Sequence, residues 1–328
     1  MADGRLKPIA GGVGQAGEAT AGLAALPRAA PRMGTVARLL EDERVLGVLL
    51  LVPTVVLLAL FIAYPFVKGV WLSLTSATVG NPGVFVALGN FAKIWNDTIF
   101  QQAAYNTFVY TAIATVGKLV LGMWLALLLN RHFKGKRLVR ASMLLPFIIP
   151  TVLSTFAWKW MFDPTFSVLN WSLYHLGVIQ TRIGWLTDPT LALGSVIIVN
   201  VWRGMPFYAI TLLAGLQTVN PELHEAAAID GANAWHRFWR ITWPLLLPVT
   251  MVVTLFSVIQ TFADFQLVYV LTGGGPANST HLFATYAYQI GIATGLLGEG
   301  AAASLAMFPI LFFIVVAQLW YIRRVEGA

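Results

Sequence analysis

The chain has 328 residues, of which 58% are hydrophobic and only 11% are charged, and its formal net charge is +7. Soluble domains carry about 25% charged residues, so this composition excludes an ordinary soluble protein and indicates an integral membrane protein. The chain contains no cysteine, which excludes disulfides, thiolate metal sites and cysteine nucleophiles.

The first segment, residues 1–44, is rich in Ala, Gly, Pro and Arg. Its apolar patch, residues 22–26, is too short for the core of a signal peptide and lies close to Pro27 and Pro31. We therefore expect a flexible cytoplasmic tail that is not cleaved, with arginines that favour an anionic lipid surface.

Beyond the tail, six apolar runs reach the roughly 20 residues that cross a hydrocarbon core. They span residues 45–67, 107–129, 141–162, 192–216, 248–271 and 301–322. No fixed period repeats along the chain, so a solenoid or propeller is not indicated. We expect one all-α transmembrane domain over residues 45–328.

The distribution of lysine and arginine predicts sidedness, because basic residues in short loops stay in the cytoplasm. Fifteen of them fall in the tail, in the loop 130–140, in the segment 217–247 and at the C-terminus. The opposite loops hold only Lys68, Lys93 and Arg182. Both termini and the segment 217–247 are therefore expected in the cytoplasm, and the net charge is a topology signal rather than a sign of nucleic-acid binding.

The loops 79–97 and 163–188, on the opposite side, carry aromatic residues among turn residues. This pattern suits an aromatic belt at the membrane surface and also suits a docking surface.

The segment 217–247, which we call the island, is polar and lies between two apolar runs. Asn220 before Pro221 predicts a helix start, and Glu222 and Glu225 fall near the first turn, where the helix dipole favours acids. The three alanines after Glu225 keep this helix narrow, and Gly231 permits a sharp turn. Any polytopic membrane protein can carry a surface helix of this kind, so these features alone assign no function.

The spacing within the island is more specific. It resembles the EAA motif of ABC-importer permeases, with Glu225-Ala226-Ala227, then Gly231, Ile241 and Pro244 in register. Trp243 departs from the motif, because leucine is usual before the proline.

The resemblance extends from the first apolar run to the last and is closest to the maltose and glycerol-phosphate branch of carbohydrate-uptake permeases. It rests on Asn106-Thr107, on Trp202-Arg203 with Pro206-Phe207, and on residues 271–276, Leu-Thr-Gly-Gly-Gly-Pro.

The resemblance implies a type I ABC importer permease fold in a bacterial-type inner membrane, with six transmembrane helices and a cytoplasmic coupling helix between helices 4 and 5. It implies a non-catalytic subunit that forms half of the translocation path for a sugar or sugar derivative. The implied partners are a second, different permease, two copies of a cytoplasmic ATPase that binds ATP and Mg, and an extracytoplasmic solute-binding protein; a homodimer stays open. The residues implied in ATPase coupling are Glu225, Ala226, Ala227, Asp230 and Gly231.

The sequence itself supports this division of labour. It has no G-x-x-x-x-G-K-[ST] phosphate loop, no G-x-S-x-G elbow, and no pair of histidines at metal-ligand spacing. ATP hydrolysis is therefore expected in a partner subunit, and no cofactor or metal is expected in this chain.

Charged residues inside the predicted spans cost roughly 2.5 to 3.5 kcal/mol each near a helix centre. Lys159 lies near a span end and is expected to snorkel, whereas Lys118 faces either the protein interior or the path. Arg203 and Asp264 lie deep in the runs that flank the island, where they line the path, form a structural ion pair or make separate interface contacts. Our candidates for the substrate path are Asn200, Trp202, Arg203, Tyr208, Gln260, Phe262, Asp264 and Gln266.

Two other function classes fit part of the pattern. An ion-coupled secondary transporter explains the spans and the buried charges but gives the Glu-Ala-Ala helix no role. A polytopic membrane enzyme needs a polar catalytic cluster, and none stands out. The identity of the sugar lies beyond the sequence.

Overall fold

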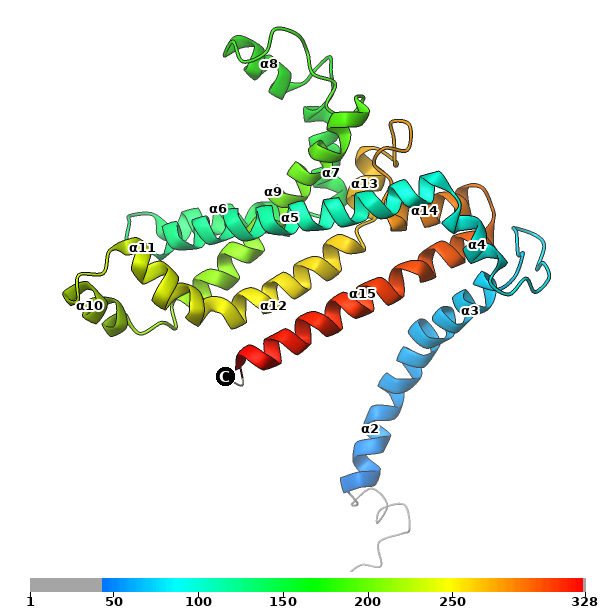
Figure 1. Ribbon diagram of the computed structural model, residues 1–328, viewed down its shortest axis with the longest axis horizontal. Coiled ribbons are helices and arrows are strands. Elements are labelled where there is room, and N and C mark those ends of the chain that lie inside the picture. Colours follow the sequence, from blue (N-terminus) through cyan, green and yellow to red (C-terminus); the bar gives the residue numbers. More distant parts are fainter. Residues whose placement is uncertain (1–42, 327–328) are drawn as a thin grey trace, which may run out of the picture. The chain divides into compact units, whose positions relative to one another are not determined.

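The computed structural model describes residues 43–326 (Figure 1). The expected tail, residues 1–44, falls outside the described residues except for its last two. The chain divides into two compact units, Met1–Ile62 and Ala63–Ala328. The described part of the first unit holds helix α2 (Glu43–Leu58), whose large apolar side chains are exposed along its whole length. A helix that is apolar all round is typical of a membrane span.

The second unit is helical. Its helices are α3 (Tyr64–Ser73), α4 (Gly89–Trp95), α5 (Thr98–Asn130), α6 (Lys136–Ile148), α7 (Thr151–Met161), α8 (Val168–His175), α9 (Pro189–Leu216), α10 (Pro221–Ile229), α11 (Ala234–Arg237), α12 (Trp243–Phe262), α13 (Gln266–Leu271), α14 (Phe283–Tyr288) and α15 (Leu297–Glu326). Short π-helical turns η1 (Ala59–Ala63), η2 (Phe238–Thr242) and η3 (Gln289–Ala293) connect some of them. Residues 43–326 contain isolated β-bridges but no named strand.

Five helical stretches are long and apolar enough to cross a membrane, and a sixth is present if one bent helix pair counts as a span. The five are Arg44–Ser73, Thr98–Asn130, Pro189–Leu216, Ala234–Phe262 and Leu297–Arg324. Five of the six predicted spans therefore match continuous helical stretches, at least over most of their length.

Two predicted spans differ from the structure in shape. The run 141–162 is not one straight helix, because α6 and α7 meet at an angle of 92° beside Pro150. Proline cannot donate the helical hydrogen bond and disfavours a helical residue before it, so the chain turns there. The run 248–271 was also predicted as continuous, but α12 ends at Phe262 and the separate α13 begins at Gln266.

The centre of the second unit is the packing of α5 against α9 (Figure 1). The two helices approach closely at Gly122, where an added Cβ would lie 2.4 Å from the Cβ of Tyr208. Small residues let helix backbones approach in this way. A hydrophobic cluster of Met123, Leu212, Leu246 and neighbouring side chains then joins α5 and α9 to α12.

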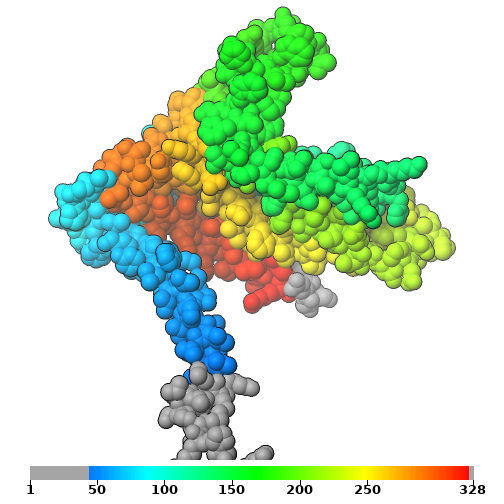
Figure 2. All heavy atoms as spheres, turned by 180° about the vertical axis from the view of Figure 1, so that it is seen from behind, coloured from blue at the N-terminus to red at the C-terminus, as the bar shows by residue number. Residues whose placement is uncertain are grey.

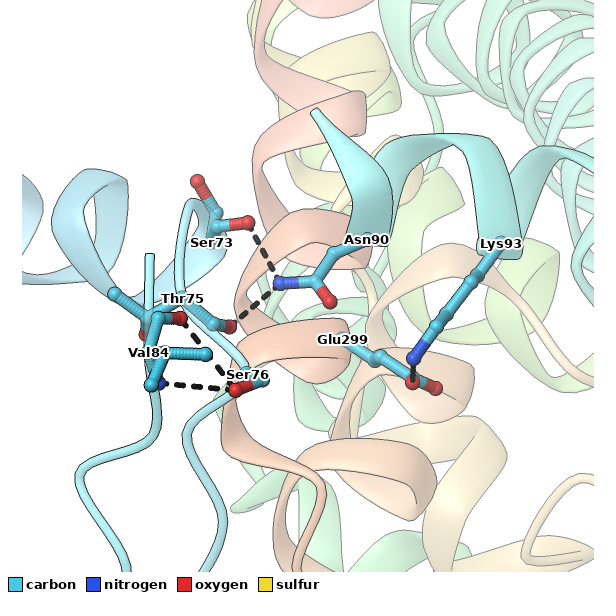
Figure 3. A network of polar contacts seen from close by, with 7 residues as sticks. All are labelled: Ser73, Thr75, Ser76, Val84, Asn90, Lys93 and Glu299. Atoms are coloured by element: carbon cyan, nitrogen blue, oxygen red, sulfur yellow. Dashed lines mark hydrogen bonds and ion pairs between the residues drawn. The ribbon is translucent and has the colours of Figure 1, made fainter. Parts of the chain in front are cut away.

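At the end of this unit that carries α4, polar contacts tie three segments together (Figure 3). The side chain of Asn90 donates to the backbone oxygens of Ser73 at 2.8 Å and Thr75 at 2.7 Å. The Nζ of Lys93 in α4 lies 2.9 Å from Oε1 of Glu299 in α15. These contacts provide donors for backbone oxygens at the end of α3 and hold α4 against α15.

The loop 163–188 forms an arm that carries α8 and projects from the helices (Figure 2). Asn170 is buried and holds the arm together, because it donates to the backbone oxygen of Ile183 at 2.9 Å and accepts from Nε1 of Trp185 at 3.0 Å. Phe166 and Trp171 point outward and are exposed. The structure is compatible with both a membrane belt and a docking surface.

Candidate functional site

The island folds as two short helices at the opposite end of the second unit from α4 (Figure 1). Oδ1 of Asn220 accepts a hydrogen bond from the backbone N–H of Glu222 at 3.1 Å, and Pro221 is the first residue of α10. The predicted helix start is confirmed.

Gly231 ends α10 in the left-handed conformation, with φ of +82°. The N–H of Ala232 donates to the backbone oxygen of Ala227 at 2.9 Å, which closes the last turn. A Cβ added at Gly231 would meet no atom within 4 Å. Within this chain, glycine is therefore needed for its backbone conformation and not for lack of space.

The five predicted coupling residues lie together on α10 and its final turn. Ala227 is half-buried, and Glu225, Ala226, Asp230 and Gly231 are exposed. Beside them, Ile229 is 88% exposed. Full burial of an isoleucine against a partner contributes about 1.5 to 3 kcal/mol, so this helix offers an apolar contact that its own chain leaves open.

The second helix of the island connects α10 to α12. Oδ1 of Asn233 caps α11 by accepting from the N–H of His236 at 2.9 Å. The rings of Trp235, Trp239 and Trp243 then follow one another at centroid distances of 5.5 and 5.7 Å. Trp243, the departure from the family motif, thus takes part in an aromatic row that leads from the island into α12.

The two helices of the island are also held to each other. Nη1 of Arg237 donates to the backbone oxygen of His224 at 3.4 Å. Between the island and the end of α5 lies a hollow of about 1060 Å³, lined in part by Leu127, Arg131 and Glu225. The island is therefore a supported surface that suits binding to another protein.

A second polar site lies inside the unit, where Asp264 joins residues of α5 and α9. Its Oδ2 accepts a hydrogen bond from the hydroxyl of Tyr110 at 2.7 Å and from Nδ2 of Asn200 at 3.1 Å. Arg203 and Asp264 form no direct ion pair. The ion-pair alternative is therefore wrong for this conformation, because neutral donors occupy the carboxylate.

Lys118 lies in the same interior and is only 4% exposed. Its Nζ donates to Oγ1 of Thr261 at 2.7 Å, so it faces the protein interior. Its side chain crosses α9 at Gly204, where an added Cβ would lie 2.4 Å from the Cδ of Lys118. Lys159 is exposed, as expected for a snorkelling side chain, and its Nζ donates to the backbone oxygen of Val270 at 3.1 Å.

The other candidates for the substrate path lie in different surroundings. Tyr208 and Phe262 are each 1% exposed and pack in hydrophobic clusters, so neither ring presents a face to a solute. Trp202 is half-buried and packs edge-on against Trp158 at 5.4 Å. Gln260 and Gln266 are exposed. Of the eight candidates, the structure brings together Asn200 and Asp264 by direct contact, and we leave Tyr208 and Phe262 out of the proposed path.

Sequence reasoning missed Tyr110 and Thr261, which hold Asp264 and Lys118. A signal for α5 was present, because Thr107, Thr111, Thr115 and Lys118 recur at three- and four-residue intervals in an apolar run and so share one helix face. In the described part of the chain, no group of three or more His, Asp or Glu side chains is arranged to hold a metal ion.

The family model of the binding-protein-dependent transport system inner membrane component matches residues 118–327. The chain is 36% identical over 283 residues to the sulfoquinovosyl glycerol transport system permease protein SmoG of Agrobacterium fabrum, covering 86% of this chain and 91% of that protein. It is 34% identical over 285 residues to the trehalose/maltose transport system permease protein MalF of Thermococcus litoralis, covering 86% of this chain and 96% of that protein.

Among solved structures, the chain is similar in fold to a chain of a bacterial ABC transporter involved in the import of the acidic polysaccharide alginate. The TM-score is 0.76 at 22% identity, over 89% of this chain and 99% of that chain. The expected fold class, a type I importer permease, is confirmed.

Proposed function

This chain belongs to the family of inner membrane components of binding-protein-dependent transport systems, and from this membership we propose that it forms half of the translocation path of an ATP-driven importer. In this proposal the chain itself is not an enzyme. A partner ATPase binds ATP and Mg, hydrolyses ATP and drives the path between its two open states.

The observation that carries the proposal is the geometry of α10. Its capped start and left-handed end at Gly231 place Glu225, Ala226 and Asp230 on one exposed helical turn beside the exposed Ile229. Nη1 of Arg237 in α11 donates to the backbone oxygen of His224 in α10 at 3.4 Å. The aromatic row of Trp235, Trp239 and Trp243 then runs from α11 into α12. A partner that binds α10 is therefore linked through α11 to a membrane-spanning helix.

The proposed solute is a sugar or sugar derivative. This proposal rests on the relatives, whose names include transport of sulfoquinovosyl glycerol and of trehalose or maltose. Asn200 and Arg203, both half-buried, are the polar side chains that we propose face the path. Hydrogen-bonding groups of this kind orient a polyhydroxylated solute.

The proposed assembly has the island and both chain termini in the cytoplasm, as the fifteen basic residues on that side indicate. A second, different permease completes the path, two ATPase copies bind the two coupling helices, and a solute-binding protein docks on the opposite face.

The test is reconstitution of this permease with its partner permease, ATPase and binding protein in vesicles. We expect ATP-dependent sugar uptake, and we expect Glu225→Lys to abolish both uptake and the stimulation of ATP hydrolysis. Glu222→Lys is the matched control, since it makes the same charge change on the same exposed helix. Uptake that continues without ATP but stops when an ion gradient is removed would instead establish a secondary transporter.

A further inference from the structure

The span that begins at the island ends at a break beside Asp264. One helical stretch, Ala234–Phe262, runs for 29 residues from the island to this break. At 1.5 Å per residue it is about 43 Å long, which is enough to cross a hydrocarbon core. The break occupies residues 263–265, after which α13 begins at Gln266.

A break of this kind interrupts the helix, so a displacement of α12 is not passed directly to α13. The N–H groups of Ala263 and Asp264 still donate to backbone oxygens of α12, at 3.3 and 3.2 Å, but no backbone hydrogen bond joins α12 to α13 across residues 263–265. A movement of α12 would therefore be absorbed there unless other contacts bridge the break. Asp264 supplies such contacts from within the break itself.

The carboxylate of Asp264 holds three helices at once. Its Oδ1 accepts from the backbone N–H of Leu267 at 3.3 Å, in the first turn of α13. Its Oδ2 accepts from the hydroxyl of Tyr110 in α5 at 2.7 Å and from Nδ2 of Asn200 in α9 at 3.1 Å. A carboxylate accepts several donors in fixed directions, which suits it to join helices that share no backbone hydrogen bond.

The two neighbouring cations do not contact the carboxylate of Asp264. Lys118 contacts Thr261, three residues before Asp264, and not the carboxylate. Arg203 forms no ion pair with Asp264, and its Nε is buried without a hydrogen-bond partner. The neutral donors therefore set the position of the carboxylate.

From these contacts we propose that Asp264 is a positioning residue for transport, which makes α12 and α13 move together with α5 and α9 when the island is displaced. The inference rests on the proposed function. In it, Asp264 touches neither solute nor nucleotide, and its role is to convert a movement of the island into a movement of the helices around the path. Loss of its contacts uncouples ATP hydrolysis from import without preventing assembly.

The experiment compares Asp264→Ala and Asp264→Asn with the wild type in the reconstituted complex. The readout is the number of sugar molecules imported per ATP hydrolysed, measured at equal amounts of assembled complex. Asp188→Asn is the matched control, because the side chain of Asp188 also accepts from backbone N–H groups at a helix start but is exposed and bonds only residues of its own helix, Thr190 and Leu191.

A second readout follows the helices directly. The chain has no cysteine, so Phe256→Cys in α12 and Tyr105→Cys in α5, both exposed, accept spin labels without background. In the wild type we expect ATP to leave the distance between the labels nearly unchanged, because the two helices move as one body. In the Asp264→Ala background we expect ATP to shift and broaden this distance. A merely structural role would broaden it equally with and without ATP.

We expect import per ATP to fall about tenfold or more in Asp264→Ala, because three hydrogen bonds are lost, and to fall less in Asp264→Asn. An unchanged ratio in both variants, or a label distance that responds to ATP as in the wild type, would overturn the proposal. If Asp264→Ala does not assemble, Tyr110→Phe decides, since it removes one donor and keeps the carboxylate. An unchanged ratio in this variant would also overturn the proposal. Failure of the wild type to import with ATP would refute the proposed function instead.

Discussion

A substitution at Gly231 can test whether the island docks on a partner, because a second glycine in the chain has the same backbone conformation and serves as a control. Gly231 has φ of +82° and Gly135, at the start of α6, has φ of +81°. An added Cβ would meet nothing within 4 Å at either position. Replacement by leucine therefore causes the same strain at both sites, about 1 to 2 kcal/mol for a left-handed residue with a Cβ, and no steric clash within the chain.

The two variants are expected to differ only in what they do to a partner. Gly231→Leu places a bulky side chain in the space around the turn of α10, and if that space receives the ATPase, docking is lost. Gly135→Leu lies outside the island. We expect equal losses of thermal stability in detergent, normal uptake and stimulated ATP hydrolysis for Gly135→Leu, and loss of both for Gly231→Leu.

The assay is co-purification of the ATPase with each permease variant, followed by uptake and ATP hydrolysis in vesicles. Normal stimulated ATP turnover with Gly231→Leu would refute the assignment of α10 as the docking helix. Equal failure of the two variants would show that backbone strain, and not a blocked interface, explains the loss.

Three further outcomes are expected. Gly204→Ala should lower thermal stability by about 1 to 3 kcal/mol, because its Cβ would displace the buried side chain of Lys118, whereas Gly194→Ala, on the same helix with nothing within 4 Å, should be neutral or stabilising. Burial lowers the pKa of His281 from its ordinary value of 6.5, so the unfolded state binds the proton more readily. The contribution of His281 to the free energy of unfolding should therefore be fully present above pH 6.5 and decrease as the pH falls below that value. In His281→Asn, thermal unfolding should no longer show this pH dependence. Asn106→Ala should cost about 2 kcal/mol in thermal unfolding, since the side chain donates to the backbone oxygens of Ser279 and His281 at 2.8 and 3.1 Å.

The membrane character and the island were predictable from sequence because both are local patterns. Apolar length predicted the spans, and five of the six match continuous helical stretches over most of their length. Asn220, Pro221 and Gly231 predicted the start and end of α10, since capping and left-handed turns depend on a few neighbouring residues.

The breaks in the helices were harder to predict from the sequence. Pro150 marks the bend between α6 and α7, but proline also occurs inside α9 and α12 without ending them. The break before α13 carries no proline. It contains Asp264, whose carboxylate accepts hydrogen bonds from two other helices.

By itself, the sequence determined a multi-span helical protein with a capped polar helix between two spans, because hydropathy, capping and charge act over short stretches of chain. Only the tertiary structure decided that Asp264 is held by Tyr110 and Asn200, 154 and 64 residues away, and not by an ion pair with Arg203. It also decided that Tyr208 and Phe262 are core residues. The physical reason is that a buried polar group takes the donors that helix packing brings to it, and a periodic pattern shows which face of a helix is buried but not which distant helix covers that face.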